Sequence, residues 1–254
     1  MPRVGSTGPG PGRGRFDPRP LIPAHRRRLA AAFVLACAVV VAVLGALFAG
    51  QSQPDRLDAA VGDWLRSTIG THPAPLNVLV NFGEPPLVTA LTVVLVLAAM
   101  VGRRWRGAVL AAVAVPLAVG LTELALKPLF GRTIGGALSY PSGHATSGFA
   151  LATVAAILFA APARPRIPAF ARRLLLLGAF LFAAAVAIAM VAHWYHYFTD
   201  IIGGAAVGSG TVILTALVLT ALPRPAFGGS ERFGRAPRAP SLKPHRRIGG
   251  SERE

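Results

Sequence analysis

Eight residues in three short segments could together carry out a reaction. They supply cations, a serine and glycine beside a histidine, two further histidines and a carboxylate: Lys127, Arg132, Ser142, Gly143, His144, His193, His196 and Asp200. Such groups suit phosphoryl transfer, in which cations and amides hold the anion while a nucleophile and a proton donor act on it.

The pair His196 and Asp200 resembles an activated nucleophile. A carboxylate can hold an imidazole in one tautomer, so that its other nitrogen presents a directed lone pair to an electrophile such as phosphorus. Two other interpretations stay open. His196 could belong to an aromatic belt at the membrane interface while Asp200 caps the next helix, or His193, His196 and Asp200 could be metal ligands.

The segment around Ser142 is typical of an anion-binding helix start. Ser142 is a good N-cap, Gly143 lets the backbone approach a phosphate, and His144 in the first turn can pass a proton to a leaving oxygen. A plain capped turn is the alternative.

Lys127 and Arg132 lie at the end of an apolar run, where single cations usually extend toward lipid headgroups. Glycines in 131–136 would let the loop fold over a ligand. Glu123 precedes Lys127 by one helical turn and could pair with it.

The elements that position these residues are apolar helices. The chain is 53% hydrophobic and 14% charged, which favours a bilayer environment. We predict an all-α bundle of six transmembrane helices within a domain at 29–222, and an interfacial helix in 51–76. The spans are expected at 29–50, 82–101, 108–126, 143–162, 174–192 and 201–222. Residues 1–28 and 223–254 are rich in Gly, Pro and Arg and predict disordered basic tails.

The basic residues predict the topology. Of 26 Lys and Arg, 22 lie in segments on the side of the N-terminus, which places both termini in the cytoplasm of a multi-pass plasma-membrane protein. The charge is thus explained without a nucleic-acid partner. The single cysteine, Cys37, allows no internal disulfide and no thiolate metal cluster. Because successive helices alternate in direction, the three reactive segments should meet on the extracytoplasmic face.

These residues, in this order, resemble the type 2 phosphatidic acid phosphatase superfamily, membrane lipid phosphatases related to vanadium haloperoxidases. The likeness runs from about 55 to 222 and is most specific at PSGH, residues 141–144. The resemblance implies that His196 becomes phosphorylated, Asp200 orients it and His144 protonates the leaving group. It also implies that phosphate is bound by Lys127, Ser142 and Gly143.

Two family arginines are missing. Ile134, followed by Gly135, stands where the first motif has Arg-Pro, and Met190 stands where the third motif has arginine. Such guanidiniums clamp the phosphoryl oxygens. We expect Arg132 to take over one of these roles and His193 part of the other.

The sequence therefore predicts a phosphatase for a membrane lipid phosphate or a polyprenyl pyrophosphate. It would act through a phosphohistidine, without a metal or other cofactor, and its partners would be the lipid substrate and the surrounding lipids. The alternative is a non-catalytic protein that binds anionic lipids. A transporter using Glu123 is less consistent with the sequence, because no matched pair of interrupted helices is visible.

Overall fold

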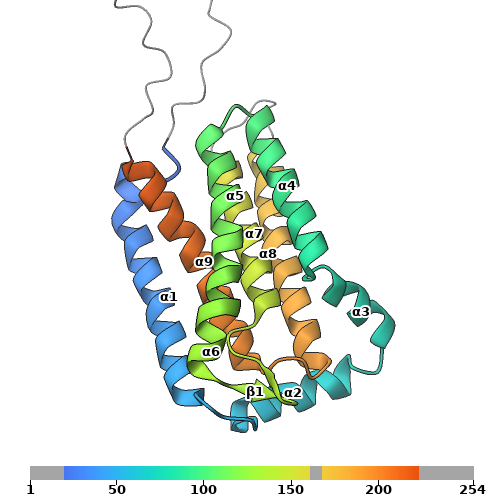
Figure 1. Ribbon diagram of the computed structural model, residues 1–254. Coiled ribbons are helices and arrows are strands. Elements are labelled where there is room, and N and C mark those ends of the chain that lie inside the picture. The colour runs from blue at the N-terminus through green and yellow to red at the C-terminus, as the bar shows by residue number, and fades with distance from the viewer. Residues whose placement is uncertain (1–19, 161–167, 223–254) are drawn as a thin grey trace, which may run out of the picture. The chain divides into compact units, whose positions relative to one another are not determined.

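The computed structural model describes residues 20–160 and 168–222, which are mostly helical (Figure 1). The helices are α1 (Arg27–Phe48), α2 (Arg56–Thr68), α3 (Pro73–Asn81), α4 (Pro85–Val101), α5 (Trp105–Gly120), α6 (Lys127–Phe130), α7 (Gly143–Ala160), α8 (Ala169–Ala192) and α9 (Phe198–Ala221). A 3-10 turn (Ala24–Arg26) precedes α1, and a π-helical turn (Leu121–Leu126) joins α5 to α6.

The described part of the chain begins at residue 20, before the expected boundary at residue 29. Leu21 and Ile22 are buried, and the Ile22 amide donates to Thr220 Oγ1 of α9 at 3.4 Å. The remainder of the two expected tails, residues 1–19 and 223–254, lies outside the described residues.

Five helical segments within the described residues are long and apolar enough to cross a membrane. They are Ala24–Phe48, Trp105–Phe130, Gly143–Ala160, Ala169–Ala192 and Phe198–Ala221. The pair α3 and α4, bent by 53°, makes a sixth when it counts as one span. The bend follows from Pro85 and Pro86 in the first turn of α4, because proline cannot continue the hydrogen bonds of a preceding helix. The predicted all-α membrane bundle is confirmed.

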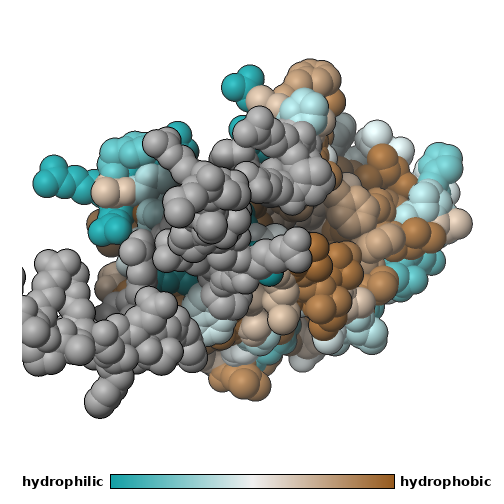
Figure 2. Space-filling view, turned by 90° about the horizontal axis from the view of Figure 1, so that it is seen from above, coloured by the Kyte–Doolittle hydropathy of each residue, from teal (hydrophilic) through white to brown (hydrophobic). Residues whose placement is uncertain are grey.

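The outer surface of the bundle suits lipid. Large apolar side chains are exposed on α1, α4, α8, α9 and the span Trp105–Phe130, for example Leu35, Val94, Leu124, Leu181 and Val218. The end-on view of Figure 2 shows such hydrophobic surface along a flank of the bundle. This surface and the span lengths make the chain a multi-pass membrane protein.

Small residues allow α7 and α9 to pack closely. A Cβ added at Gly208 of α9 would overlap the Thr146 carbonyl oxygen of α7, and one at Gly204 would overlap the Ser142 carbonyl oxygen. Thr153 Oγ1 of α7 also donates to Ser209 Oγ of α9 at 3.3 Å. The close contact fixes the start of α7 against the start of α9.

A two-stranded hairpin lies at the same end of the bundle as α2 (Figure 1). Strands β1 (Thr133–Ile134) and β2 (Ala137–Leu138) are joined by Gly135 and Gly136, both with positive φ, as a tight two-residue turn requires. The glycine-containing loop that was expected to fold over a ligand therefore includes a defined hairpin. The Thr133 amide donates to the Gln51 carbonyl at 2.9 Å, which ties the hairpin to the end of the first span.

Candidate active site

The three reactive segments meet at one end of the bundle, the lower end in Figure 1. The Ser142 amide donates to the Asp200 carbonyl oxygen at 3.0 Å, so the second and third segments are in direct contact. His144, Lys127 and His196 line the same two cavities, of about 810 and 460 Å³. The structure thus brings Lys127, His144 and His196 from the three segments together around these cavities.

His196 and Asp200 face each other across the link from α8 to α9. His196 is 8% exposed, and its Nδ1 lies 3.6 Å from Asp200 Oδ2 without a hydrogen-bond partner among the described residues. Asp200 Oδ2 accepts a hydrogen bond from the Tyr197 amide at 3.0 Å. The gap is longer than a hydrogen bond, and such catalytic contacts commonly shorten when substrate binds. The arrangement can hold the ring with Nδ1 toward the carboxylate.

The start of α7 forms the second side of the site. Ser142 is buried, and its Oγ accepts from the Ala145 amide at 3.4 Å, as an N-cap does. Gly143 lines the larger cavity, and His144 Nε2 lies 3.8 Å from Glu84 Oε1. Helix N-termini attract anions, so this turn offers a place for phosphate.

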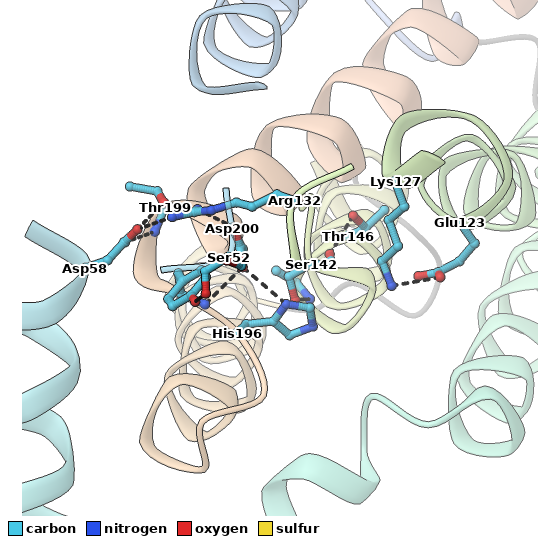
Figure 3. A network of polar contacts seen from close by, with 12 residues as sticks. Ser52, Asp58, Glu123, Lys127, Arg132, Ser142, Thr146, His196, Thr199 and Asp200 are labelled. Atoms are coloured by element: carbon cyan, nitrogen blue, oxygen red, sulfur yellow. Dashed lines mark hydrogen bonds and ion pairs between the residues drawn. The ribbon is translucent and has the colours of Figure 1, made fainter. Parts of the chain in front are cut away.

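Lys127 extends into both cavities from the end of the third span. Its Nζ lies 2.8 Å from Glu123 Oε2, which confirms the expected pair (Figure 3). Glu123 belongs to the π-helical turn, and its Oε1 lies so close to Gly143 that a Cβ there would overlap it. The Glu123 carboxylate therefore lies beside both the lysine and the helix start.

Arg132 lies elsewhere than its expected role requires. Its side chain is fully buried, and it lines none of the three cavities that contain His196. Nη1 donates to Asp200 Oδ1 at 2.7 Å and to Thr199 Oγ1 at 2.6 Å, while Nη2 donates to Asp58 Oδ2 at 2.6 Å. The guanidinium also lies 4.3 Å from the ring centres of Phe48 and of Tyr197. A direct contact between Arg132 and phosphate gains no support from this placement.

Asp58 is a member of the site that sequence reasoning missed. It lies on α2 with its carboxylate fully buried, and it accepts from the Thr199 amide at 2.9 Å and Thr199 Oγ1 at 2.8 Å. Figure 3 shows Asp58, Arg132 and Asp200 gathered on one side of His196. From the sequence alone, an aspartate on an amphipathic helix is expected to face solvent. The partners of Asp58 in the structure, Arg132 and Thr199, are 74 and 141 positions away along the chain.

The other positions considered from the sequence, Met190, Ile134 and His193, differ in whether they line the cavities beside His196. Met190, where the family arginine is missing, is 4% exposed and lines both cavities beside His196. Ile134 lies in β1, and His193 stacks on Tyr195 with ring centres 5.6 Å apart. Neither lines a cavity that contains His196. The expected share of His193 in phosphate binding gains no support.

Two buried tyrosines beside the site, Tyr140 and Tyr197, donate hydrogen bonds to backbone carbonyls. Burial raises the pKa of Tyr197, and it raises the pKa of Tyr140 more strongly. Both phenols therefore remain protonated donors at neutral pH. Tyr197 Oη donates to the Ser52 carbonyl at 3.1 Å, and Tyr140 Oη donates to the Val41 carbonyl at 2.8 Å.

From the sequence, His193, His196 and Asp200 are possible metal ligands. In the part of the chain that the structure describes, no group of three or more His, Cys, Asp or Glu side chains is placed to hold a metal ion. The metal interpretation of these residues therefore gains no support.

The apolar spans and the polar end define a multi-pass membrane protein with a cluster of polar and charged side chains at one end of its helix bundle. The chain belongs to the PAP2 superfamily, whose sequence profile matches residues 27–224. A solved structure with a similar fold is the first transmembrane PAP2 type phosphatidylglycerolphosphate phosphatase from Bacillus subtilis. It is 17% identical, with a TM-score of 0.59 over 72% of this chain and 93% of that one. Comparison with curated protein sequences gave no match.

Proposed function

We propose that this protein is a phosphatase for a membrane lipid phosphate, with His196 as the nucleophile. The observation that carries the proposal is the cavity of about 810 Å³. One end holds His196, His144 and Lys127, and the other runs between α4 and α5 along apolar residues such as Val93 and Val119. A phosphate with a long apolar tail fits both halves of this cavity.

The proposed reaction has two steps. His196 Nε2 attacks phosphorus, and the bond to the leaving oxygen breaks as His144 gives that oxygen a proton. Water then attacks the phosphohistidine while His144 takes a proton from it, which releases inorganic phosphate and restores both histidines. Asp200 stabilises the positive charge that forms on the His196 ring.

The anionic charge is offset by protein groups in this proposal. In this proposal Lys127 Nζ leaves Glu123 for the phosphate, and the backbone of Gly143 at the start of α7 lines the same cavity. The reaction needs no metal or other cofactor. Terminal phosphates of phosphatidate, phosphatidylglycerol phosphate and polyprenyl pyrophosphate all present the required group.

Orientation follows from the basic residues. The proposed site lies at the end of the bundle opposite Arg103 and Arg104, and that basic end is cytoplasmic by the positive-inside rule. The site therefore faces away from the cytoplasm in the plasma membrane, and the substrates lie in the outer leaflet.

The test is phosphate release from phosphatidate and from undecaprenyl pyrophosphate by the purified protein in detergent. We expect His196→Ala to reduce release at least about 1000-fold, because the nucleophile is lost. His193→Ala, a histidine outside the cavities, is the matched control and should retain most activity. Equal release by wild type and His196→Ala would overturn the mechanism.

A second function is favoured by two observations. Met190 places an apolar side chain where the family has arginine, and Glu123 already pairs with Lys127. Both fit a protein that binds anionic lipid without turning it over. Saturable binding of phosphatidate vesicles with no phosphate release would support this function over the phosphatase.

A further inference from the structure

We propose that Asp58 is a positioning residue for the His196–Asp200 pair. Arg132 cancels the negative charge of Asp200, and Asp58 restores one net negative charge beside His196. The inference rests on the proposed function, because it assigns His196 as the group whose charge changes. It concerns a residue on α2, outside the three motif segments.

The contacts show how Asp58 acts through its neighbours. Arg132 joins the two carboxylates, with Nη2 on Asp58 Oδ2 at 2.6 Å and Nη1 on Asp200 Oδ1 at 2.7 Å. Thr199 completes the link, because it donates to Asp58 and accepts from Arg132. With Oδ1 held by Arg132, Asp200 presents Oδ2 to His196 Nδ1. Asp58 therefore fixes the guanidinium that fixes Asp200.

The charge balance gives Asp58 a second role. The side chains of Asp58, Arg132 and Asp200 are all fully buried. Arg132 and Asp200 alone would have no net charge, and the imidazole would then become positive beside a neutral pair. With Asp58 the cluster carries one net negative charge, which matches the positive charge that develops on His196 as its Nε2 bonds to phosphorus.

Other charged groups near His196 do not reproduce this arrangement. Those that share its cavities come from α2, the α3–α4 link, the third span and α7: Asp63, Arg66, Glu84, Glu123, Lys127 and His144. Asp63 is 74% exposed and pairs with Arg66, so water screens its charge. Of the two aspartates on α2 that share a cavity with His196, only Asp58 has no exposed surface on its carboxylate.

The first experiment compares Asp58→Asn with Asp63→Asn, which removes the same charge from the exposed side of the same helix. We expect Asp58→Asn to lower kcat about tenfold with little change in KM. The acid limb of its pH–rate profile should move about one pH unit lower, because the imidazole loses a neighbouring negative charge. Asp63→Asn should leave the acid limb in place. An unmoved limb in Asp58→Asn, with only a lower Tm, would overturn the proposal.

The double variant Asp58→Asn with Arg132→Gln separates charge from structure. It removes one negative and one positive charge, so the cluster again carries one net negative charge. We expect the acid limb to return toward the wild-type position even though the hydrogen-bond network is broken. A purely structural role predicts no such return, and that result would count against the proposal.

A third readout does not require turnover. Histidine labelled with ¹³C can be titrated by NMR in detergent micelles, with the His196 signal assigned by its loss in His196→Ala. We expect the midpoint for His196 to fall in Asp58→Asn and to recover in the double variant. If the protein releases no phosphate but the midpoint moves in this way, the phosphatase fails while the charge role stands. An unmoved midpoint overturns the charge role itself.

Discussion

At the residue scale, Met190 marks the main difference between this site and that of the family. Its side chain lines both cavities beside His196, so a guanidinium at this position would reach the phosphate site. Of the Lys and Arg side chains in the described residues, Lys127 is the one that lines these two cavities. The proposed transition state therefore receives less positive charge than a site with arginine clamps provides.

This difference predicts a gain of activity in Met190→Arg. We expect kcat/KM for phosphatidate to rise at least about tenfold, because a buried cation near the transferring phosphoryl group commonly contributes several kcal/mol. Initial rates of phosphate release in detergent would measure it. Met190→Gln has a similar length and no charge, and an equal gain there would show that charge is not the cause.

The separation along the chain between interacting residues decides which residues of the site the sequence could indicate. His144 lies in one short segment, and His196 and Asp200 lie together in another. In each segment the residue types and their spacing indicate the chemistry. Arg132 and Asp58 do not, because each is defined by a partner far away along the chain. A motif position suggested phosphate binding for Arg132, whereas burial beside two carboxylates gives it a different role. Only the folded arrangement distinguishes these two roles.

At the element scale, α7 and α9 must stay in close contact for the site to form. Gly208 faces the α7 backbone so closely that a methyl group would overlap the Thr146 carbonyl oxygen. Four residues earlier, Gly204 faces Ser142 in the same way, next to the turn that carries His144. Movement of α9 would therefore also separate His144 from Asp200.

Gly208→Ala is expected to destabilise the protein by about 1–3 kcal/mol, because overpacking forces the helices apart. Gly178→Ala is the matched control on α8, where an added Cβ would meet no atom within 4 Å. There alanine should be neutral or stabilise by about 0.5–1 kcal/mol, since glycine weakens a helix interior. Thermal unfolding in detergent measures both variants. A Tm for Gly208→Ala at or above that of Gly178→Ala would contradict the packing argument.

Apolar runs predicted five of the spans to within about five residues at each end, because the length of a membrane helix is set by the bilayer. The expected span at 82–101 corresponds to α4, which reaches span length only together with α3. The details that position the site were not predicted. Helix α3, and the 53° bend that separates it from α4 before Pro85, were not expected. The π-helical turn at 121–126, which sets Glu123 and Lys127 against Gly143, has no distinctive sequence pattern. Local sequence thus indicates which helices exist, whereas contacts between them decide their irregular turns.

At the scale of the whole molecule, the two ends of the bundle differ in charge. The end that carries Arg103 and Arg104 is basic, whereas the opposite end holds Asp58, Glu123 and Asp200 with few cations. The basic end should remain in the cytoplasm during insertion, because Lys and Arg near span ends resist translocation. The proposed phosphatase would therefore meet its lipid phosphate in the outer leaflet.

Cysteine labelling can measure this orientation, since Cys37 is the single native cysteine and is buried. In a Cys37→Ser background, Thr71→Cys lies in the exposed link between α2 and α3, and Ala169→Cys lies at the exposed start of α8. We expect a membrane-impermeant maleimide to label Thr71→Cys in intact cells, and Ala169→Cys only after the membrane is permeabilised. The reverse pattern would place His196 on the cytoplasmic face, so the substrate would be an inner-leaflet lipid phosphate. The cavity and its chemistry would be unchanged by that result, because they depend on the fold and not on its direction in the membrane.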